Sequence, residues 1–418
     1  MRRNRYDIGL MSASVLKHTK TGRALFWSSA LSEPLFTLYG LIAIILYKDL
    51  GASAWQIALM TCCKPLFTIL SFYWSAGLGR SGKVKSNVLW AGFLMRAPFL
   101  LCPFFDSAWF VIAAAVNYMF FHRAVIPGWM EIIKRNMDAG NRGKLFSLSS
   151  AFGYAEGVVL SLAMGCVLDH DPGLWRILFF GAALLGMGVL VIQSRIPVEE
   201  KKRTGEKLNW KELLARPWKD SYRLIRTRPD FARYQWGFMV CGFGIMLIQP
   251  ALPIFAVDDL GVSYTVAAGG ISIAKGLGFA LSSPIWARWI ERVNVLKLAS
   301  WVFLSVALFP VFMACSVWWI GWFYLAYFWY GVGQGGSHLV WHMSGPIFAG
   351  KEESSRFTGV GLMMGGLRGA VAPPMGGWLA VALGPIEVLL LGGALCFYSG
   401  ARLLQSRFAK KDEVLQKI

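Results

Sequence analysis

Seven charged side chains lie near the middle of long apolar stretches of this chain, where a charge requires a partner or a function. An ionisable residue at the centre of a helix in hydrocarbon costs about 2.5–3.5 kcal/mol on insertion scales, so each one marks a candidate site. If these groups share a cavity, its net charge is positive and a small anion would balance it. Five are bases and two are acids: Lys64, Arg96, Arg123, Lys275, Arg368, Glu33 and Glu156.

Binding of a carboxylate or a phosphate is the chemistry that such a set favours. Arginine holds a planar anion through two parallel hydrogen bonds, whereas lysine acts as a point charge. The sequence therefore predicts ligand contacts from Lys64, Arg123, Lys275 and Arg368. The alternative for each of them is a structural role, in which the cation bonds backbone carbonyls or extends toward water.

The two acids suggest a second kind of chemistry, the binding and release of a proton. Glu33 lies about one third of the way along its apolar stretch and is followed by Pro34. Desolvation and a nearby base change the proton affinity of a carboxyl in opposite directions, so an approaching ligand or arginine could switch Glu33. A hydrogen-bonded or cation-paired structural acid is the alternative.

One predicted span carries four polar and aromatic residues at spacings of four, three and one, from Gln334 to His342. These spacings place them on one helical face. We interpret them as a mixed aromatic and hydrogen-bonding wall of the same site, with Gln249, which precedes Pro250, on the opposite wall. The histidine pair could hold zinc, but zinc takes three or four ligands, so no metal and no cofactor is predicted. The four residues are Gln334, His338, Trp341 and His342.

Composition places these residues in a membrane. The 418 residues are 56% hydrophobic and 16% charged, with a mean hydropathy of +0.50, against roughly 25% charged residues in soluble domains. The net charge of +19 comes from Lys and Arg in short connections between apolar stretches, which predicts membrane orientation rather than a nucleic-acid partner. The seven cysteines lie in apolar stretches without metal-ligand spacing.

Twelve apolar stretches are each long enough to cross about 30 Å of hydrocarbon. Basic residues gather on every second connection, so both termini lie on one side, and the positive-inside rule places that side in the cytoplasm. We therefore expect a monomeric, multi-pass protein of a bacterial cytoplasmic membrane. The predicted spans are 24–47, 54–78, 86–105, 108–133, 145–168, 174–194, 234–257, 263–290, 295–315, 317–348, 356–382 and 384–406.

The long connection in the middle divides the chain into two halves. We expect residues 24–194 and 234–406 to form one bundle each, with tails at 1–23 and 407–418. A shift of 211 residues aligns Lys64 with Lys275 and Trp90 with Trp301, which indicates a duplication. Within the connection 195–233, apolar residues from Trp210 to Ile225 share one face and predict an amphipathic helix on the membrane surface; a solvated linker is the alternative.

Several motifs resemble those of the major facilitator superfamily. Gly79-Arg-Ser-Gly-Lys83 is similar to the family's loop 2–3 signature, with Gly79 in place of the usual Asp, and this resemblance assigns Arg80, Gly82 and Lys83 to a cytoplasmic gate. Asn141-Arg-Gly-Lys-Leu-Phe146 resembles the family's loop 4–5 motif, and Arg368-Gly-Ala-Val-Ala-Pro-Pro-Met-Gly-Gly377 resembles its span 11. Without the acid, Arg80 needs another partner.

The resemblance implies an all-α membrane protein with twelve transmembrane helices in two pseudo-symmetric bundles of six. Spans 1, 4, 7 and 10 would line a central cavity, and spans 2, 5, 8 and 11 would form the interface between the halves. Glu156 and Lys275 then lie on neighbouring spans, so we expect an ion pair between them that acts as a switch. The implied function is secondary active transport of a small organic anion by alternating access, with proton coupling left open.

Two other functions remain open at this point. One is a proton-coupled exporter of drugs or metabolites with the same fold; if it exported apolar cations, an excess of cavity acids would be expected. The other is a non-transporting receptor or a membrane enzyme. No metal-ligand set, nucleophile motif or phosphate-binding loop is evident in the sequence, so we expect no enzyme activity.

Overall fold

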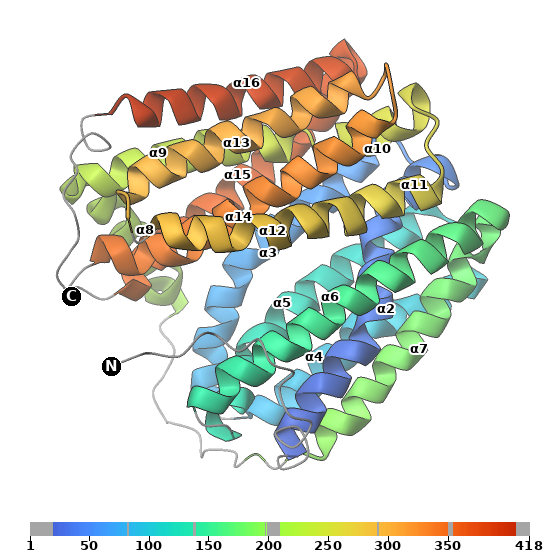
Figure 1. The fold of residues 1–418 in the computed structure, drawn as a ribbon. Helices are drawn as coiled ribbons and strands as arrows, with labels where there is room; N and C mark the ends of the chain where they lie inside the picture. Colours follow the sequence, from blue (N-terminus) through green and yellow to red (C-terminus); the bar gives the residue numbers. More distant parts are fainter. Residues whose placement is uncertain are drawn as a thin grey trace, which may run out of the picture.

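The computed structural model describes residues 20–81, 83–136, 139–196, 198, 210–290, 292–349 and 354–406. Over these ranges the chain is helical, and its connections are short turns (Figure 1). Residues 1–19 and 407–418 of the two predicted tails and the predicted gate residue Gly82 lie outside the described residues. The predicted all-α membrane fold is confirmed.

The first half consists of long helices joined by short turns. Near residue 97 one of them continues as a 3-10 segment, where Pro98 and Pro103 limit regular α-helical hydrogen bonding. The elements are α2 (Lys20–Lys48), α3 (Ala54–Ser81), α4 (Val84–Arg96), η1 (Ala97–Phe104), α5 (Ala108–Asn136), α6 (Ala139–His170), η2 (Pro172–Leu174) and α7 (Trp175–Ser194).

The second half follows the linker helix α8 (Trp210–Thr227) and has two interrupted helices. The first breaks at a turn over residues 248–250, and each contains a π-helical segment, η3 or η4. The elements are α9 (Pro229–Leu247), α10 (Ala251–Ile254), η3 (Phe255–Asp259), α11 (Tyr264–Ala268), η4 (Gly269–Ala274), α12 (Lys275–Ile290), α13 (Val295–Cys315), α14 (Gly321–Ala349), α15 (Ser354–Leu383) and α16 (Pro385–Leu404).

Within the described residues, 8 helical segments are long and apolar enough to cross a membrane. Four further helices have 28 to 32 residues and carry more glycine or charge, and these are α3, α6, α14 and α15. Their length suffices for a span. The exact count of twelve spans stays a prediction.

The two halves meet on one side of the bundle and separate on the other. We call the side with Lys20, Ser81, Asn136 and Ser194 the tail side, and the opposite side the far side. On the far side, one apolar core includes Leu46 and Ile57 of the first half and Phe255 and Tyr264 of the second. On the tail side the apolar clusters are separate, and the bundles diverge in that direction (Figure 1).

The linker helix α8 belongs to the second half. It contacts α9 and α15, and Leu224 is buried in the apolar cluster of that half. Trp218 and Tyr222, which we predicted on the same apolar face, are exposed at 41% and 59%. The helix therefore has a narrow packed face and leaves aromatic side chains outside. Its predicted apolar residues Trp210, Leu213 and Leu214 have side chains outside the described residues.

Candidate functional site

Three of the predicted cations come together at the boundary between the halves. The charge of Lys64 on α3 is repelled by that of Arg123 on α5, and Lys275 on α12 is repelled by Lys64. The positive charges of Arg123 and Lys64 also act on the imidazole ring of His122, the residue before Arg123. Lys64 is solvent-exposed in spite of these neighbours from both halves. The boundary between the halves therefore carries a concentrated positive charge.

Glycine contacts fix the backbone beneath the two lysines. A Cβ at Gly369 of α15 would lie 2.2 Å from Pro65, so α15 packs directly against α3 beside Lys64. A Cβ at Gly331 of α14 would lie 1.9 Å from the carbonyl oxygen of Lys275, and one at Gly278 would clash equally with Phe328. Only residues without a side chain permit these close crossings. The positions of Lys64 and Lys275 therefore depend on glycine packing.

An aromatic stack leads from this basic cluster into the first half. Tyr39 of α2 stacks on Tyr118 of α5 at 5.2 Å between ring centroids, and Tyr118 stacks on His122 at 5.6 Å. Tyr118 also interacts electrostatically with Arg96 and Glu33. The stack connects the basic cluster with the acids deeper in the first half.

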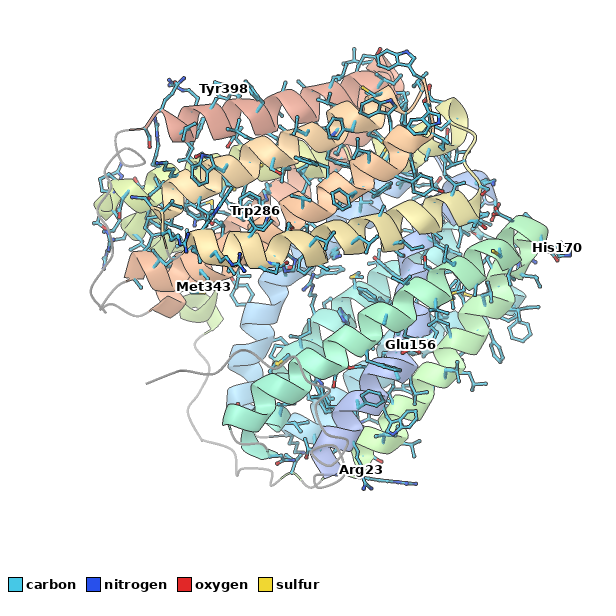
Figure 2. The ribbon with its side chains drawn as sticks, viewed as in Figure 1. Arg23, Glu156, His170, Trp286, Met343 and Tyr398 are labelled. Carbon is cyan, nitrogen blue, oxygen red and sulfur yellow. The ribbon has the colours of Figure 1, made fainter. Side chains whose placement is uncertain are left out.

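The two acids lie beside each other. A Cβ at Gly157 of α6, the residue after Glu156, would lie 2.5 Å from Oε1 of Glu33 on α2. Figure 2 labels Glu156 on α6, where this helix packs against α2.

The predicted Glu156–Lys275 ion pair is not formed in this structure. Oε2 of Glu156 is buried without a hydrogen-bond partner, and Lys275 has Lys64 as its described charged neighbour. The reason is geometric: α6 contacts the other half through α11 and η4 on the far side, whereas Glu156 is further toward the tail side.

Arg368 lies apart from the other predicted cations. It is 7% exposed, its guanidinium lies 3.9 Å from the Phe238 ring centroid, and Nη1 donates to the Phe238 carbonyl oxygen. Trp341, which we predicted for the same site, packs beside it at 5.8 Å. Arg368 and Trp341 thus meet inside the second half, against Gly242 of α9.

Arg96 has a similar place in the first half. It is 3% exposed, and it donates hydrogen bonds to the Gly92 carbonyl oxygen at 2.8 Å and to Ser32 Oγ at 3.0 Å. A Cβ at Gly186 of α7 would lie 2.6 Å from its Nε. Both buried arginines therefore occupy space that a glycine leaves open.

The remaining predicted residues are distributed along the boundary. Gln249 lies in the turn after α9, where its Nε2 donates to the Ile245 carbonyl oxygen at 3.4 Å, and it also bonds Tyr330 of α14. His338 is exposed and packs against Phe279 of α12 at 5.8 Å. Gln334 is half-buried. Lys83 precedes α4 and is exposed. The side chains of His342 and Arg80 lie outside the described residues.

On the far side, Asp169 at the end of α6 caps the first turn of α11 in the other half. Its Oδ1 accepts from the Tyr264 backbone N–H at 2.6 Å, and its Oδ2 accepts from that of Thr265 at 2.9 Å. Burial raises the pKa of the Asp169 carboxyl, but the hydrogen bonds from Thr265 and Tyr264 outweigh it, so the net pKa lies below its ordinary value.

Tyr264 also joins the halves through its ring and hydroxyl. The hydroxyl donates to Asp49 Oδ2, and the Lys48 ammonium lies 4.6 Å from the ring centroid. Burial raises the pKa of Asp49, against the opposing effects of Tyr264 and Lys48. Nearby, Tyr47 donates to Asp258. These contacts close the far side.

Sequence reasoning missed this far-side closure. Asp49, Asp169 and Asp258 looked like ordinary loop acids, because an alternating charge pattern shows the side of the membrane but no partner. A weak signal was present: Ser263 and Tyr264 begin a helix, and a helix start attracts a carboxylate.

Comparisons with known proteins agree with this architecture. The family model of the Major Facilitator Superfamily matches residues 25–373. No curated protein matches the chain in sequence.

Among solved structures, a POT family transporter in complex with 5-aminolevulinic acid has a TM-score of 0.72 at 13% identity, covering 93% of this chain and 96% of the other. The nucleoside transporter NupG has a TM-score of 0.66 at 13% identity, covering 92% and 98%. A bacterial homolog of the human lysosomal transporter Spinster has a TM-score of 0.63 at 16% identity, covering 95% and 99%. The match to the family model over most of its length shows that the chain belongs to the Major Facilitator Superfamily.

Proposed function

We propose that this protein is a secondary active transporter of small organic anions, acting as a monomer in the cytoplasmic membrane with the tail side in the cytoplasm. The observation that carries the proposal is the exposed Lys64, whose charged neighbours Arg123 and Lys275 come from both halves. Lys64 is repelled by a cation from each half, and a carboxylate or phosphate beside it removes that repulsion.

An anion in this position would also link the halves. Arg123 belongs to the first half and Lys275 to the second, so an anion bound to both favours their approach on the tail side. Closing the tail side requires the far side to open, which breaks the caps at Asp169 and Asp49. Alternating access then follows from exchange between these two sets of contacts.

Proton coupling is the second part of the proposal, and we assign it to Glu33 and Glu156. The two carboxyls interact with each other and, through Tyr118 and His122, with the basic cluster. An anion that neutralises the cluster weakens the positive field over the acids and so favours their protonation. Symport of an anion with a proton is the expected result.

A stability screen of the purified protein tests anion binding. Mono- and dicarboxylates, phosphate esters, neutral nucleosides and organic cations are added at two pH values, because a ligand that binds only the folded state raises the melting temperature. We expect anions to stabilise the parent and the exposed-site control Lys219→Gln, and to lose this effect in Lys64→Gln. Stabilisation by cations alone would contradict the proposal.

Uptake into proteoliposomes tests the coupling separately. With the anion found in the screen, an inward proton gradient should drive accumulation in the parent and not in Glu33→Gln, while counterflow of anion persists in both. Equal pH dependence in parent and variant would remove Glu33 from the coupling but leave anion binding intact. A C-terminal green fluorescent protein fusion, which fluoresces only from the cytoplasm, tests the orientation.

A further inference from the structure

A pocket on the tail side of the second half lies outside the site described above. It has a volume of about 690 Å³ and lies between α8, α9 and the end of α16. Arg226, Arg233 and Trp236 line it together with the polar side chains of Gln405 and Ser406. The lining combines two cations with an aromatic ring and hydrogen-bonding groups, which is a composition suited to an anionic ligand.

Neither arginine in this pocket has a carboxylate partner among the described side chains. Arg226 stacks over the Tyr222 ring at 4.7 Å, and Arg233 lies over Trp236 at 5.9 Å. The nearby acid, Asp230, is bound by Arg228, with 3.2 Å between Nη2 and Oδ2. Aromatic contacts orient the two guanidinium groups but leave their N–H donors available. The pocket therefore has net positive charge.

The pocket lies where a membrane lipid can reach it. Trp236 is 38% exposed and Tyr398 is 49% exposed, and the two rings contact each other edge to face at 5.9 Å. Figure 2 shows Tyr398 on the outer surface of α16. Exposed Trp and Tyr on the outside of a membrane protein typically lie at headgroup level. Further toward the far side, the outer surface of α16 exposes Leu390 and Leu391.

We propose that this pocket binds the headgroup of an anionic phospholipid from the tail-side leaflet. The phosphate lies between Arg226 and Arg233, with Gln405 beside the rest of the headgroup, and the acyl chains follow Trp236 and Tyr398 along α9 and α16. Each interfacial arginine contributes attraction to an anionic lipid that a zwitterionic lipid does not receive. The bound lipid bridges the linker helix α8 to the second half.

Native mass spectrometry of the full-length protein tests the site with phosphatidylglycerol and phosphatidylcholine of identical acyl chains. The parent should retain phosphatidylglycerol preferentially. In Arg226→Gln with Arg233→Gln, its affinity should fall about 30-fold, since each interfacial charge contributes roughly fivefold. Arg288→Gln, which removes an exposed arginine of the tail side outside the pocket, should behave as the parent does.

A second arm distinguishes a lipid from a soluble phosphate. Inorganic phosphate and glycerol phosphate at millimolar concentration should neither displace phosphatidylglycerol nor raise the melting temperature. Displacement by either would overturn the lipid assignment in favour of a soluble anion. Equal retention of phosphatidylglycerol by the double variant would overturn the site itself. If the double variant fails to fold, Arg233→Gln against Arg233→Lys gives the same test with a fivefold difference.

Discussion

Arg96 and Arg368 lie inside single halves of the molecule, whereas Lys64, Arg123 and Lys275 lie at the boundary between the halves. The two buried arginines have backbone carbonyl, hydroxyl or aromatic partners and a space that a glycine leaves open. The boundary cations repel one another. Arg96 and Arg368 thus contribute to the packing of their own bundles, while the repulsion at the boundary is what the proposed anion would relieve.

In the sequence, the five mid-span bases could not be told apart; the structure divides them into these two groups. Part of the excess of basic residues at mid-span has hydrogen-bond or aromatic partners within a single bundle, as Arg96 and Arg368 do. In the proposed mechanism, the remaining charge is carried by helices that approach or separate as the two halves move. Predictions can therefore address the two regions separately, by changing the packing that positions the boundary cations, the cations themselves, and the contacts that hold the far side closed.

The largest effect is expected from the glycine that positions Lys275. In Gly331→Ala, the added Cβ would lie 1.9 Å from the Lys275 carbonyl oxygen, and backbone cannot rotate away as a side chain can. We expect a loss of roughly 3 kcal/mol in the free energy of unfolding, together with loss of anion binding. Thermal unfolding in detergent measures the first and the ligand-induced shift in melting temperature measures the second.

Gly276 provides the matched control for that substitution. It lies on the same helix as Lys275, one residue away, and a Cβ there meets nothing within 4 Å. Gly276→Ala should therefore be neutral or stabilise the helix by up to about 1 kcal/mol, because alanine has the higher helix propensity. Equal destabilisation by both substitutions would show that the crossing of α12 and α14 does not position the site.

The second prediction compares the substitution of one boundary cation, Lys64, with that of one buried cation, Arg368. Lys64→Met should weaken anion binding by roughly 10- to 150-fold, which corresponds to a charge-assisted hydrogen bond of about 1.5–3 kcal/mol, and should preserve or raise thermal stability by removing repulsion. Arg368→Met should leave anion affinity within about twofold and change only the melting temperature. Isothermal titration and thermal unfolding of both variants give the comparison.

The opposite outcome would be as informative. If Arg368→Met abolished anion binding while its melting temperature remained unchanged, the buried arginine would belong to the binding site of another conformer. The division between interior and boundary cations would then fail. A double variant with Lys64→Met distinguishes the cases, because additive effects indicate independent regions and non-additive effects indicate a shared ligand.

The fold could be predicted further than the site because it depends on patterns rather than on contacts. Apolar stretches, alternating basic connections and partial family motifs predict helices, sidedness and two halves. Whether Arg368 faces Phe238 or the boundary depends on helix rotation and on Gly242, and a single sequence does not specify either. The Glu156–Lys275 pairing rested on span adjacency, but neighbouring helices can touch at one end and leave mid-span residues apart.

The third prediction concerns the contacts that close the far side. Because Asp169 is an exposed helix cap, its substitution should lower the free energy of unfolding by about 0.5–1 kcal/mol. The folded pKa of Asp169 is lowered, so its stabilisation is present above the unfolded value of about 3.9 and is lost as pH falls through the folded value. The folded pKa of Asp49 is raised, so its contribution is present below the unfolded value and is lost as pH rises through the folded value.

Melting temperatures from pH 3 to pH 8 test this opposition. Asp169→Asn should reduce the loss of melting temperature that occurs as pH falls at the acidic end of the range. Asp49→Asn should reduce the loss of melting temperature that occurs as pH rises above the pKa of an unfolded Asp. Each variant serves as the control for the other, since the two carboxyls act in opposite directions on the same helix start. Identical profiles for the two variants would exclude separate roles for these acids at the far side.

The smallest effect is expected at a neutral contact of the same boundary. Ser272 Oγ on η4 donates to Ser161 Oγ on α6 at 2.8 Å, and Ser161 is 1% exposed. Ser272→Ala leaves that buried hydroxyl without its cross-boundary donor, which should weaken far-side closure by roughly 0.5 kcal/mol, the lower end for a hydrogen bond between neutral groups. Ser283→Ala is the control, because Ser283 bonds the Phe279 carbonyl oxygen of its own helix at 2.6 Å.

Spin labels at His170 and Trp318, which are both exposed on the far side, report this change as a distance distribution. Ser272→Ala should increase the population with the longer separation, while Ser283→Ala should match the parent. Because the serines carry no charge, a change confined to Ser272→Ala would show that closure depends on hydrogen bonding between the halves as well as on the acids. An unchanged distribution in both variants would assign closure to Asp49, Asp169 and the apolar core, and would place the balance between the two conformations in charged groups alone.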